Sequence, residues 1–300
     1  MDNTNLLITE EVNPLTTDID QCDTAEIVAR INNQDRLVAE AVAKELKAIC
    51  RAVDEIYCRL KKGGRLFYIG AGTSGRMGVL DASECPPTFS SDPEMIQGYI
   101  AGGDFALRCA VEGAEDDENA GAGLVAEKGI GSGDIVLGIT ASGGAPFVVG
   151  AVKQAKEAGA LTVALVNNKS TMIGGLCDIT IAPIVGPEII SGSTRMKSGT
   201  AQKMVLNIIS TTVMIKLGKV YGNLMVDLKA SNKKLYERSI RMICSTTGFS
   251  QEKAAHYLEE ADGQVKLAIM MIKSGLPRKQ AEDLLAGADG HLGKALEVLK

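Results

Sequence analysis

The pattern of apolar and polar residues predicts a long helix near the start of the chain. From Thr24 to about Leu60, apolar residues recur at spacings of three and four, which is typical of one face of an amphipathic helix. The sequence Lys-Lys-Gly-Gly at 61–64 ends this pattern. Residues 1–23 are polar and aperiodic, and we interpret them as an ordered or half-ordered arm.

The next part of the chain alternates between short β-rich runs and helical stretches. Strands are predicted at Leu66–Ile69, Met95–Ile100, Ile135–Ile139, Thr162–Val166 and Ile179–Val185. Helices are predicted at Gly75–Ser83, Phe105–Val111, Phe147–Ala158 and Thr200–Leu217. This alternation predicts an α/β fold of three layers, with a five-stranded parallel sheet covered by helices on both faces. In such a fold, ligands bind in the loops at the carboxyl ends of the strands.

The end of the chain contains an internal repeat. With an offset of 27, Ser250–Ile272 aligns with Pro277–Leu299, and the Ala-Asp-Gly at 261–263 aligns with the Ala-Asp-Gly at 288–290. We interpret each half as a helical hairpin with a tight Asp-Gly turn, similar to ubiquitin-associated modules. Such a module is expected to be a packing or dimer-stabilising appendage.

These patterns predict three regions. Residues 1–56 form an N-terminal arm with helices, 57–220 form the α/β domain, and 221–300 form a helical C-terminal region with the repeat.

Composition and charge exclude several functional classes. With 45% hydrophobic and 23% charged residues, the chain is expected to be globular rather than disordered. A formal net charge of −5 gives no attraction to nucleic acid. The polar start of the chain predicts no signal peptide, and polar residues interrupt the most apolar helix, so no membrane span is expected. Seven scattered cysteines, an odd number, indicate reduced thiols in the cytoplasm and argue against a zinc site.

The distribution of histidine restricts the chemistry. Both histidines, His256 and His291, lie near the end of the chain, so a site in the α/β domain lacks the commonest acid-base residue. Proton transfer there is left to Asp, Glu, Lys, Tyr or Cys. A histidine triad or a histidine metal site would require the C-terminal region to fold over that domain.

Three loops rich in glycine and hydroxyl residues follow predicted strands. Glycine permits close backbone approach, and a helix N-terminus offers unpaired amides to an anion. Each loop alone is commonly only a turn, whereas three at the strand ends of one sheet favour one phosphorylated ligand. Arg195 or Lys197 would add positive charge. The candidate ligand-binding residues are Thr73 and Ser74 in the first loop, Ser142 and Gly143 in the second, and Ser193 and Thr194 in the third.

The first loop also satisfies the pattern G-x-G-x-x-G at residues 70–75, which occurs in dinucleotide-binding sites. The carboxylate expected after the second strand is missing, because Asp92 and Glu94 precede that strand. The interpretation of the chain as a nucleotide-dependent oxidoreductase therefore depends on this loop alone.

Two carboxylates near the loops are candidates for acid-base chemistry. Glu84 ends the helix that starts at the first loop, and Pro86 and Pro87 follow it, although a glutamate at a helix end is usually only solvated. Ten residues of helix advance about 15 Å, so Ser74 and Glu84 do not serve one hexose in one subunit unless the helix turns back early. We favour a Glu84 that serves the site of a neighbouring subunit. Glu115 heads an acidic run in which nothing local distinguishes it from its neighbours.

Several long motifs resemble those of one enzyme family. They are LFYIGAGTSGRMGVLDASECPP at 66–87, AVEGAEDD at 110–117, VGPE at 185–188, GSTR at 192–195, GTAQK at 199–203 and KLGKVYGNLMVD at 216–227. From about Asn33 to the end, the chain closely resembles the N-acetylmuramic acid 6-phosphate etherases, which carry a sugar isomerase (SIS) domain.

This resemblance implies a function in cell-wall sugar recycling. Members of the family act as cytoplasmic homodimers on N-acetylmuramic acid 6-phosphate, an amino sugar phosphate. They cleave its D-lactyl ether by elimination followed by addition of water, which gives N-acetylglucosamine 6-phosphate and D-lactate. The reaction is expected to need no metal and no other cofactor. The resemblance places the proton donor on Glu84 and a second catalytic residue on Glu115.

The sequence departs from the family pattern in the second loop. Where the family usually has arginine and threonine, this chain has Gly144 and Ala145, so a charge and a hydroxyl near the expected phosphate are lost. This departure, with the helical C-terminal region, leaves one alternative open. A non-catalytic regulator that senses a sugar phosphate, like the animal glucokinase regulatory protein, would bind the ligand without turnover.

Overall fold

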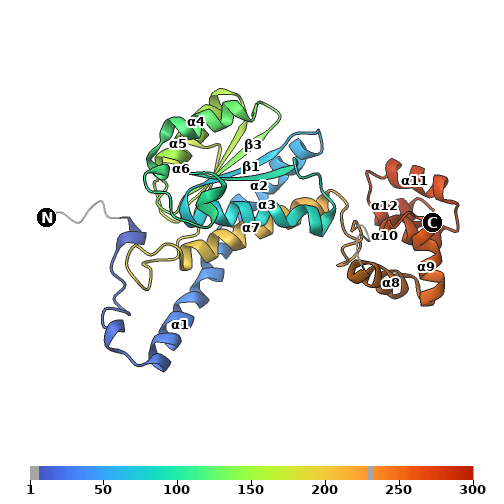
Figure 1. Ribbon diagram of the computed structural model, residues 1–300, viewed down its shortest axis with the longest axis horizontal. Helices are drawn as coiled ribbons and strands as arrows, with labels where there is room; N and C mark the ends of the chain where they lie inside the picture. The colour runs from blue at the N-terminus through green and yellow to red at the C-terminus, as the bar shows by residue number, and fades with distance from the viewer. Residues whose placement is uncertain (1–6, 229–232, 300) are drawn as a thin grey trace. The chain divides into compact units, whose positions relative to one another are not determined.

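A five-stranded parallel sheet forms the centre of the chain. The computed structural model describes residues 7–228 and 233–299 (Figure 1). The strand order is β2-β1-β3-β4-β5, and all pairs are parallel. Every residue of β1, β3 and β4 is buried, which explains why these strands are almost continuously apolar. The strands are β1 (Leu66–Gly70), β2 (Ile96–Ile100), β3 (Ile135–Ile139), β4 (Leu161–Leu165) and β5 (Ile179–Ile181).

Helices cover both faces of this sheet (Figure 1). On one face, Phe67, Ile69 and Val136 pack in a core with α4 (Glu118–Glu127), α5 (Pro146–Glu157) and α6 (Met172–Leu176). On the other face, Gly78 of α3 (Gly72–Phe89) lies against Tyr68 and Ile139. The expected fold class is confirmed.

Glycines explain how α3 starts directly at the end of β1. A Cβ at Gly70 would lie 2.6 Å from Gly75 N, and a Cβ at Gly75 would lie 2.6 Å from Ile100 Cγ1. The glycine pattern of the first loop therefore serves close packing of helix, turn and strand.

The helix α3 is longer than predicted. Its expected end at Ser83 is wrong, because the helix continues through Pro86 and Pro87 to Phe89. Both prolines lie in its last turn, so only the bonds to the carbonyls of Ala82 and Ser83 are lost.

Other element boundaries also differ from the prediction. The expected helix from Thr24 to Leu60 is two helices, α1 (Thr24–Ala43) and α2 (Leu46–Leu60). The expected helix at 105–111 is only the 3-10 turn η3 (Asp104–Leu107). A second 3-10 turn, η4 (Ala114–Asp116), precedes α4, while α7 spans Lys197–Lys216.

The C-terminal residues form a helical unit with its own core. After α8 (Lys233–Thr247), the repeat forms one hairpin from α9 (Gln251–Glu260) and α10 (Val265–Ser274), and another from α11 (Arg278–Gly287) and α12 (Leu292–Glu297). Asp262 and Asp289 both have a positive φ, of 53° and 54°. Gly263 N and Gly290 N donate to the equivalent carbonyls of Leu258 and Leu285. The two predicted Asp-Gly turns are confirmed as equivalent.

The chain forms two compact units. The first contains residues 1–83 and 94–210, and the second contains 84–93 and 211–300. The division predicted at 56 and 220 remains a prediction. In the predicted N-terminal arm, residues 7–23 include the short turns η1 (Ile8–Glu10) and η2 (Ile19–Gln21), while residues 1–6 lie outside the described part. No helix within residues 7–228 or 233–299 is long and apolar enough to cross a membrane.

Candidate active site

A cleft opens in the first unit beside the second of the three loops. Its volume is about 390 Å³, and Glu115 and the second loop lie in its wall together with the residues after β4. Two apolar side chains, Leu7 and Met172, complete this part of the wall. The lining is Leu7, Glu115, Ser142, Gly143, Gly144, Ala145, Pro146, Ser170, Thr171 and Met172.

Hydroxyl groups organise the second loop from within. The Thr140 and Ser142 hydroxyl oxygens are 3.2 Å apart, and Gly143 N donates to Thr140 Oγ1 at 3.3 Å. Gly144 N donates to Ser142 Oγ at 3.3 Å. The hydroxyls of Thr140 and Ser142 therefore order the loop at the end of β3. A hydroxyl donor at this place suits an anionic group.

Gly143 is the position of this loop that requires glycine. Its φ is +76°, and a Cβ there would lie 2.2 Å from Thr171 Cβ. Thr171 in turn caps α6, because its Oγ1 accepts from Gly174 N at 3.2 Å. Gly144 differs, because no heavy atom lies within 4 Å of the place where its Cβ would be.

The structure distinguishes Glu115 from the acidic residues that follow it. Asp117 caps α4 by accepting from Ala120 N at 2.8 Å, and Glu118 forms an ion pair with Lys153 at 2.7 Å. Glu115 instead lines the cleft. Desolvation, followed by the negative charge of Asp116, raises the pKa of Glu115 above its ordinary value. A raised pKa makes this carboxylate a stronger base.

Arg76 holds the segment that leads to Glu115. This arginine lies in the first turns of α3, and its guanidinium donates to the carbonyls of Ala106 and Leu107 at 2.7 and 3.1 Å. The positive group is thus bound to η3, so it is not directed to a ligand.

The first and third loops meet over Gly199 of α7. A Cβ at Gly199 would lie 3.2 Å from Thr73 Cγ2 and 3.5 Å from Thr194 O. Gly199 N also donates to that carbonyl at 2.9 Å. Of the other expected ligand-binding residues, Ser74 is buried in the first turn of α3, and Ser193 is half-buried.

The start of α7 is fixed by a buried carboxylate. Glu188 accepts from Lys197 N at 3.0 Å and from Ser198 N at 2.9 Å, so it satisfies two free amides of the helix end. Lys197 Nζ donates to Gln34 Oε1 and Val185 O, both at 2.9 Å, and burial lowers the pKa of this lysine. The expectation that Lys197 adds charge at the ligand is therefore wrong, because its side chain is 1% exposed and bound inside the protein. Arg195 is exposed.

Glu84 has a different setting. It is exposed on α3 and belongs to the second compact unit, so the cleft described above contains Glu115 but not Glu84 among its lining residues. Within the described ranges 7–228 and 233–299, no group of three His, Cys, Asp or Glu side chains is arranged to hold a metal ion.

Comparisons with known proteins agree with this architecture. Three family models match: the N-terminal SIS domain of glucokinase regulatory protein at residues 48–156, the SIS domain at 121–211, and the C-terminal lid domain of glucokinase regulatory protein at 222–286. An N-acetylmuramic acid 6-phosphate etherase of Clostridium acetobutylicum is 55% identical over 97% of each chain. This chain belongs to the N-acetylmuramic acid 6-phosphate etherase family.

Other relatives extend the comparison. The etherase of Salmonella typhi is 50% identical, over 98% of this chain and 99% of its own. Among solved structures, phosphoheptose isomerase from Neisseria gonorrhoeae is 17% identical and covers 64% of this chain and 99% of that chain, with a TM-score of 0.49.

Sequence reasoning missed four residues of the cleft in this etherase family member, namely Leu7, Ser170, Thr171 and Met172. Thr171 follows β4 in a polar stretch, Asn167 to Thr171, and this stretch is the signal that a further strand-end loop borders the site. Leu7 carried no signal, because it reaches the cleft from the aperiodic arm.

Proposed function

We propose that this chain is an enzyme that cleaves the D-lactyl ether of N-acetylmuramic acid 6-phosphate, giving N-acetylglucosamine 6-phosphate and D-lactate. The observation that carries this proposal is identity of 50–55% to etherases over nearly the whole chain. The cleft adds support, because it places a carboxylate of raised pKa beside a loop of hydroxyls and amides. The relatives at this level of identity are named as etherases, which favours an enzyme over a non-catalytic regulator.

The proposed reaction is an elimination followed by hydration. In the open-chain sugar, the aldehyde at C1 acidifies the proton at C2. Glu115 removes this proton, the C2–C3 double bond forms, and the C3–O bond to lactate breaks. Glu84 gives its proton to the departing lactate oxygen. Water then adds its oxygen to C3 while Glu84 takes up the proton that the water loses, and Glu115 returns its proton to C2. Both carboxyl groups are thereby restored, and the net change is hydrolysis of the ether.

The three loops are proposed to hold the phosphate. Thr73, Ser74, Ser142, Ser193 and Thr194 supply hydroxyls, and Gly143, whose amide donates to Thr140 Oγ1, shapes the second loop around the ligand. Neutral donors of this kind bind a phosphate dianion well when several converge.

We further propose a cytoplasmic homodimer in which Glu84 serves the site of the neighbouring subunit. The continuity of α3 from Gly72 to Phe89 favours this arrangement, since the helix does not turn back between Ser74 and Glu84. Ten helical residues advance about 15 Å, which exceeds the reach of one hexose 6-phosphate.

The test is release of D-lactate from N-acetylmuramic acid 6-phosphate by the purified protein in water labelled with oxygen-18. We expect lactate together with label at C3 of the product sugar. Lactate that carries the label itself would contradict elimination at C3. Binding of the sugar phosphate without lactate release would overturn the enzyme and favour the regulator.

A further inference from the structure

The N-terminal arm lies along the segment that leads into the third loop. Thr16 Oγ1 donates to Ile189 O at 2.8 Å, and Asn13 Nδ2 donates to Pro187 O at 3.2 Å. Further along, Ser191 Oγ donates to the carbonyl of Glu10 at 3.0 Å. These bonds join the arm to residues 187–192 at several points along both segments.

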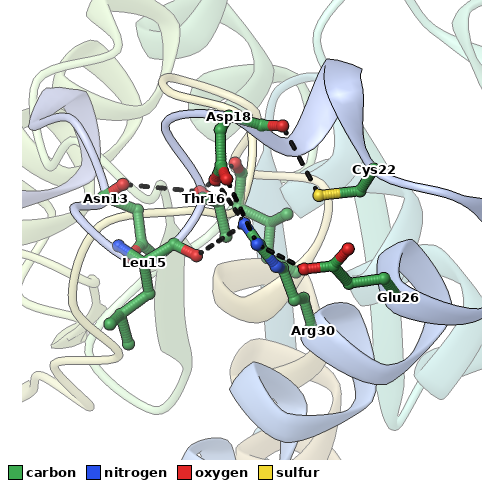
Figure 2. Close-up of polar contacts among 8 residues, drawn as sticks. Asn13, Leu15, Thr16, Asp18, Cys22, Glu26 and Arg30 are labelled. Atoms are coloured by element: carbon green, nitrogen blue, oxygen red, sulfur yellow. Dashed lines mark hydrogen bonds and ion pairs between the residues drawn. The ribbon is translucent and has the colours of Figure 1, made fainter.

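The far end of the arm is fastened to α1. Figure 2 shows the guanidinium of Arg30 directed at Asp18, Glu26 and the carbonyl of Leu15. Asn13 Nδ2 also donates to Gln34 Oε1 at 3.1 Å, the same oxygen that accepts from the buried Lys197. The arm is therefore held at several points that do not involve its first described residues.

Near its start, the arm joins two of the candidate ligand-binding loops. Thr9 is 0% exposed and Asn168 is 2% exposed, and they form a reciprocal pair. Thr9 N donates to Asn168 Oδ1 at 3.3 Å, and Asn168 Nδ2 donates to Thr9 Oγ1 at 2.9 Å. Asn168 Nδ2 also donates to Ala141 O of the second loop at 2.9 Å. On the other side, Thr9 O accepts from Gly192 N of the third loop at 3.3 Å.

A continuous series of hydrogen bonds connects the second loop to the third. It runs from Ala141 through Asn168 and Thr9 to Gly192, and each step is a hydrogen bond between buried or backbone atoms. At the exposed end of the connection, Glu10 Oε2 lies 3.0 Å from the place of a Cβ at Gly192. Buried bonds of this kind hold their partners in one geometry, since no water is at hand to replace a lost partner.

We propose that Thr9 and Asn168 are positioning residues that set the distance between the second and third loops, and thereby the affinity for the phosphate of the substrate. This inference rests on the proposed function of those loops. Neither residue lines the cleft, so both act through the backbone of the loops they join. The arm is then part of the binding site although most of it lies outside the α/β layers.

The test compares Thr9→Val, which keeps the size of the side chain but loses the hydroxyl, with Thr9→Ser, which restores it. Thr17→Val is the matched control, because Thr17 is an exposed residue of the same arm. For each variant we would measure KM and kcat for lactate release, the inhibition constant of inorganic phosphate, and Tm.

We expect Thr9→Val to raise KM and the phosphate inhibition constant together, by up to about tenfold, the range of one hydrogen bond. We expect kcat and Tm to change little, and Thr9→Ser and Thr17→Val to behave as the original protein. Asn168→Ala is expected to raise the same two constants. In the double variant, the increase should be smaller than the product of the two single increases, because both substitutions remove the same connection.

Unchanged KM and phosphate inhibition in a folded Thr9→Val protein would overturn the proposal. A fall in Tm and kcat with KM unmoved would also overturn it, since that is the signature of a purely structural residue. If the original protein releases no lactate, the proposed function fails, whereas calorimetric titration with inorganic phosphate still tests the effect of Thr9.

Discussion

At the amino edge of the parallel sheet, Asp134 accepts hydrogen bonds from the backbone and guanidinium of Arg65 and from Gly131 N, at 2.8–3.2 Å. At the carboxyl edge, Glu115 stands at a cleft and the nearest loop is held by hydroxyls and amides. Both edges carry carboxylates close to buried strands. At the amino edge the carboxylate accepts structural hydrogen bonds, whereas at the carboxyl edge Glu115 lines the cleft.

The difference shows how one fold separates stability from reactivity. Desolvation acts on both carboxylates and favours their neutral forms, but at Asp134 the bonds from Arg65 and Gly131 outweigh it and the pKa is lowered. At Glu115 desolvation is joined by the charge of Asp116, and the pKa is raised. The hydrogen bonds within the second loop join neutral hydroxyls and amides.

The largest expected effect is the loss of kcat on removing a proposed acid-base group. We expect Glu115→Gln and Glu84→Gln each to lower kcat for lactate release by about 10² to 10⁴-fold, because an amide of the same shape does not transfer the proton. Glu112→Gln, at an exposed position of the same segment, is the matched control and is expected to keep most activity. Loss of activity in the control but not in Glu115→Gln would reverse our assignment.

At the amino edge the expected effect is on stability. Asp134→Asn is expected to lower the free energy of unfolding by about 2 kcal/mol, because the charge that pairs with Arg65 is lost. The folded pKa of Asp134 lies below the unfolded one, so its contribution is present above the unfolded pKa and is lost as the pH falls through the folded pKa. The difference between the two proteins in urea unfolding should therefore shrink below about pH 4. Asp104→Asn, at an exposed position, should show no such difference. A constant difference down to pH 2 would contradict this account.

A smaller effect is expected from restoring charge at the carboxyl edge. Gly144 is exposed with open space around it, so Gly144→Arg should fold normally and lower KM for the sugar phosphate about three- to tenfold. The variant for comparison is Gly143→Ala at the neighbouring residue. There the new Cβ would clash with Thr171, and the left-handed backbone would be strained. We expect that variant to weaken binding. A higher KM in Gly144→Arg would show that the phosphate lies elsewhere.

The smallest effect concerns the cap of α5. Ala145 occupies the N-cap position and makes no side-chain cap bond. Ala145→Ser supplies a hydroxyl that can accept from the first turn, so we expect a gain of about 0.5–1 kcal/mol in thermal or urea unfolding. A loss of stability would indicate that the buried site has no room for the oxygen.

The strands were predictable because buried parallel strands leave apolar runs that little else imitates. Their centres were correct, although β5 ends at Ile181, earlier than expected. The break between α1 and α2 was not predictable, because the apolar spacing continues across it. At the break, Glu45 accepts from Ala182 N at 3.1 Å, a contact with a residue far away in the sequence.

The site was predictable only in part for the same reason. The three loops carry a local signal, but the acidic run after Gly113 offers several equivalent carboxylates. In the structure Asp117 caps α4 and Glu118 pairs with the distant Lys153. Glu115 is distinguished from them because it lines the cleft. The role of the arm left no trace in the sequence pattern, because Thr9 gains its partners only when Asn168 and Gly192 are brought to it by the fold.

The adjacent glycines of the second loop differ in how freely they can evolve. Gly143 is locked by its backbone and by Thr171, while the space beside Gly144 is empty. A single base change converts a glycine codon into an arginine codon, so natural selection can add a cation at residue 144 in one step without first repairing the fold. Residue 144 is therefore free to change, while its neighbour Gly143 preserves the shape of the loop.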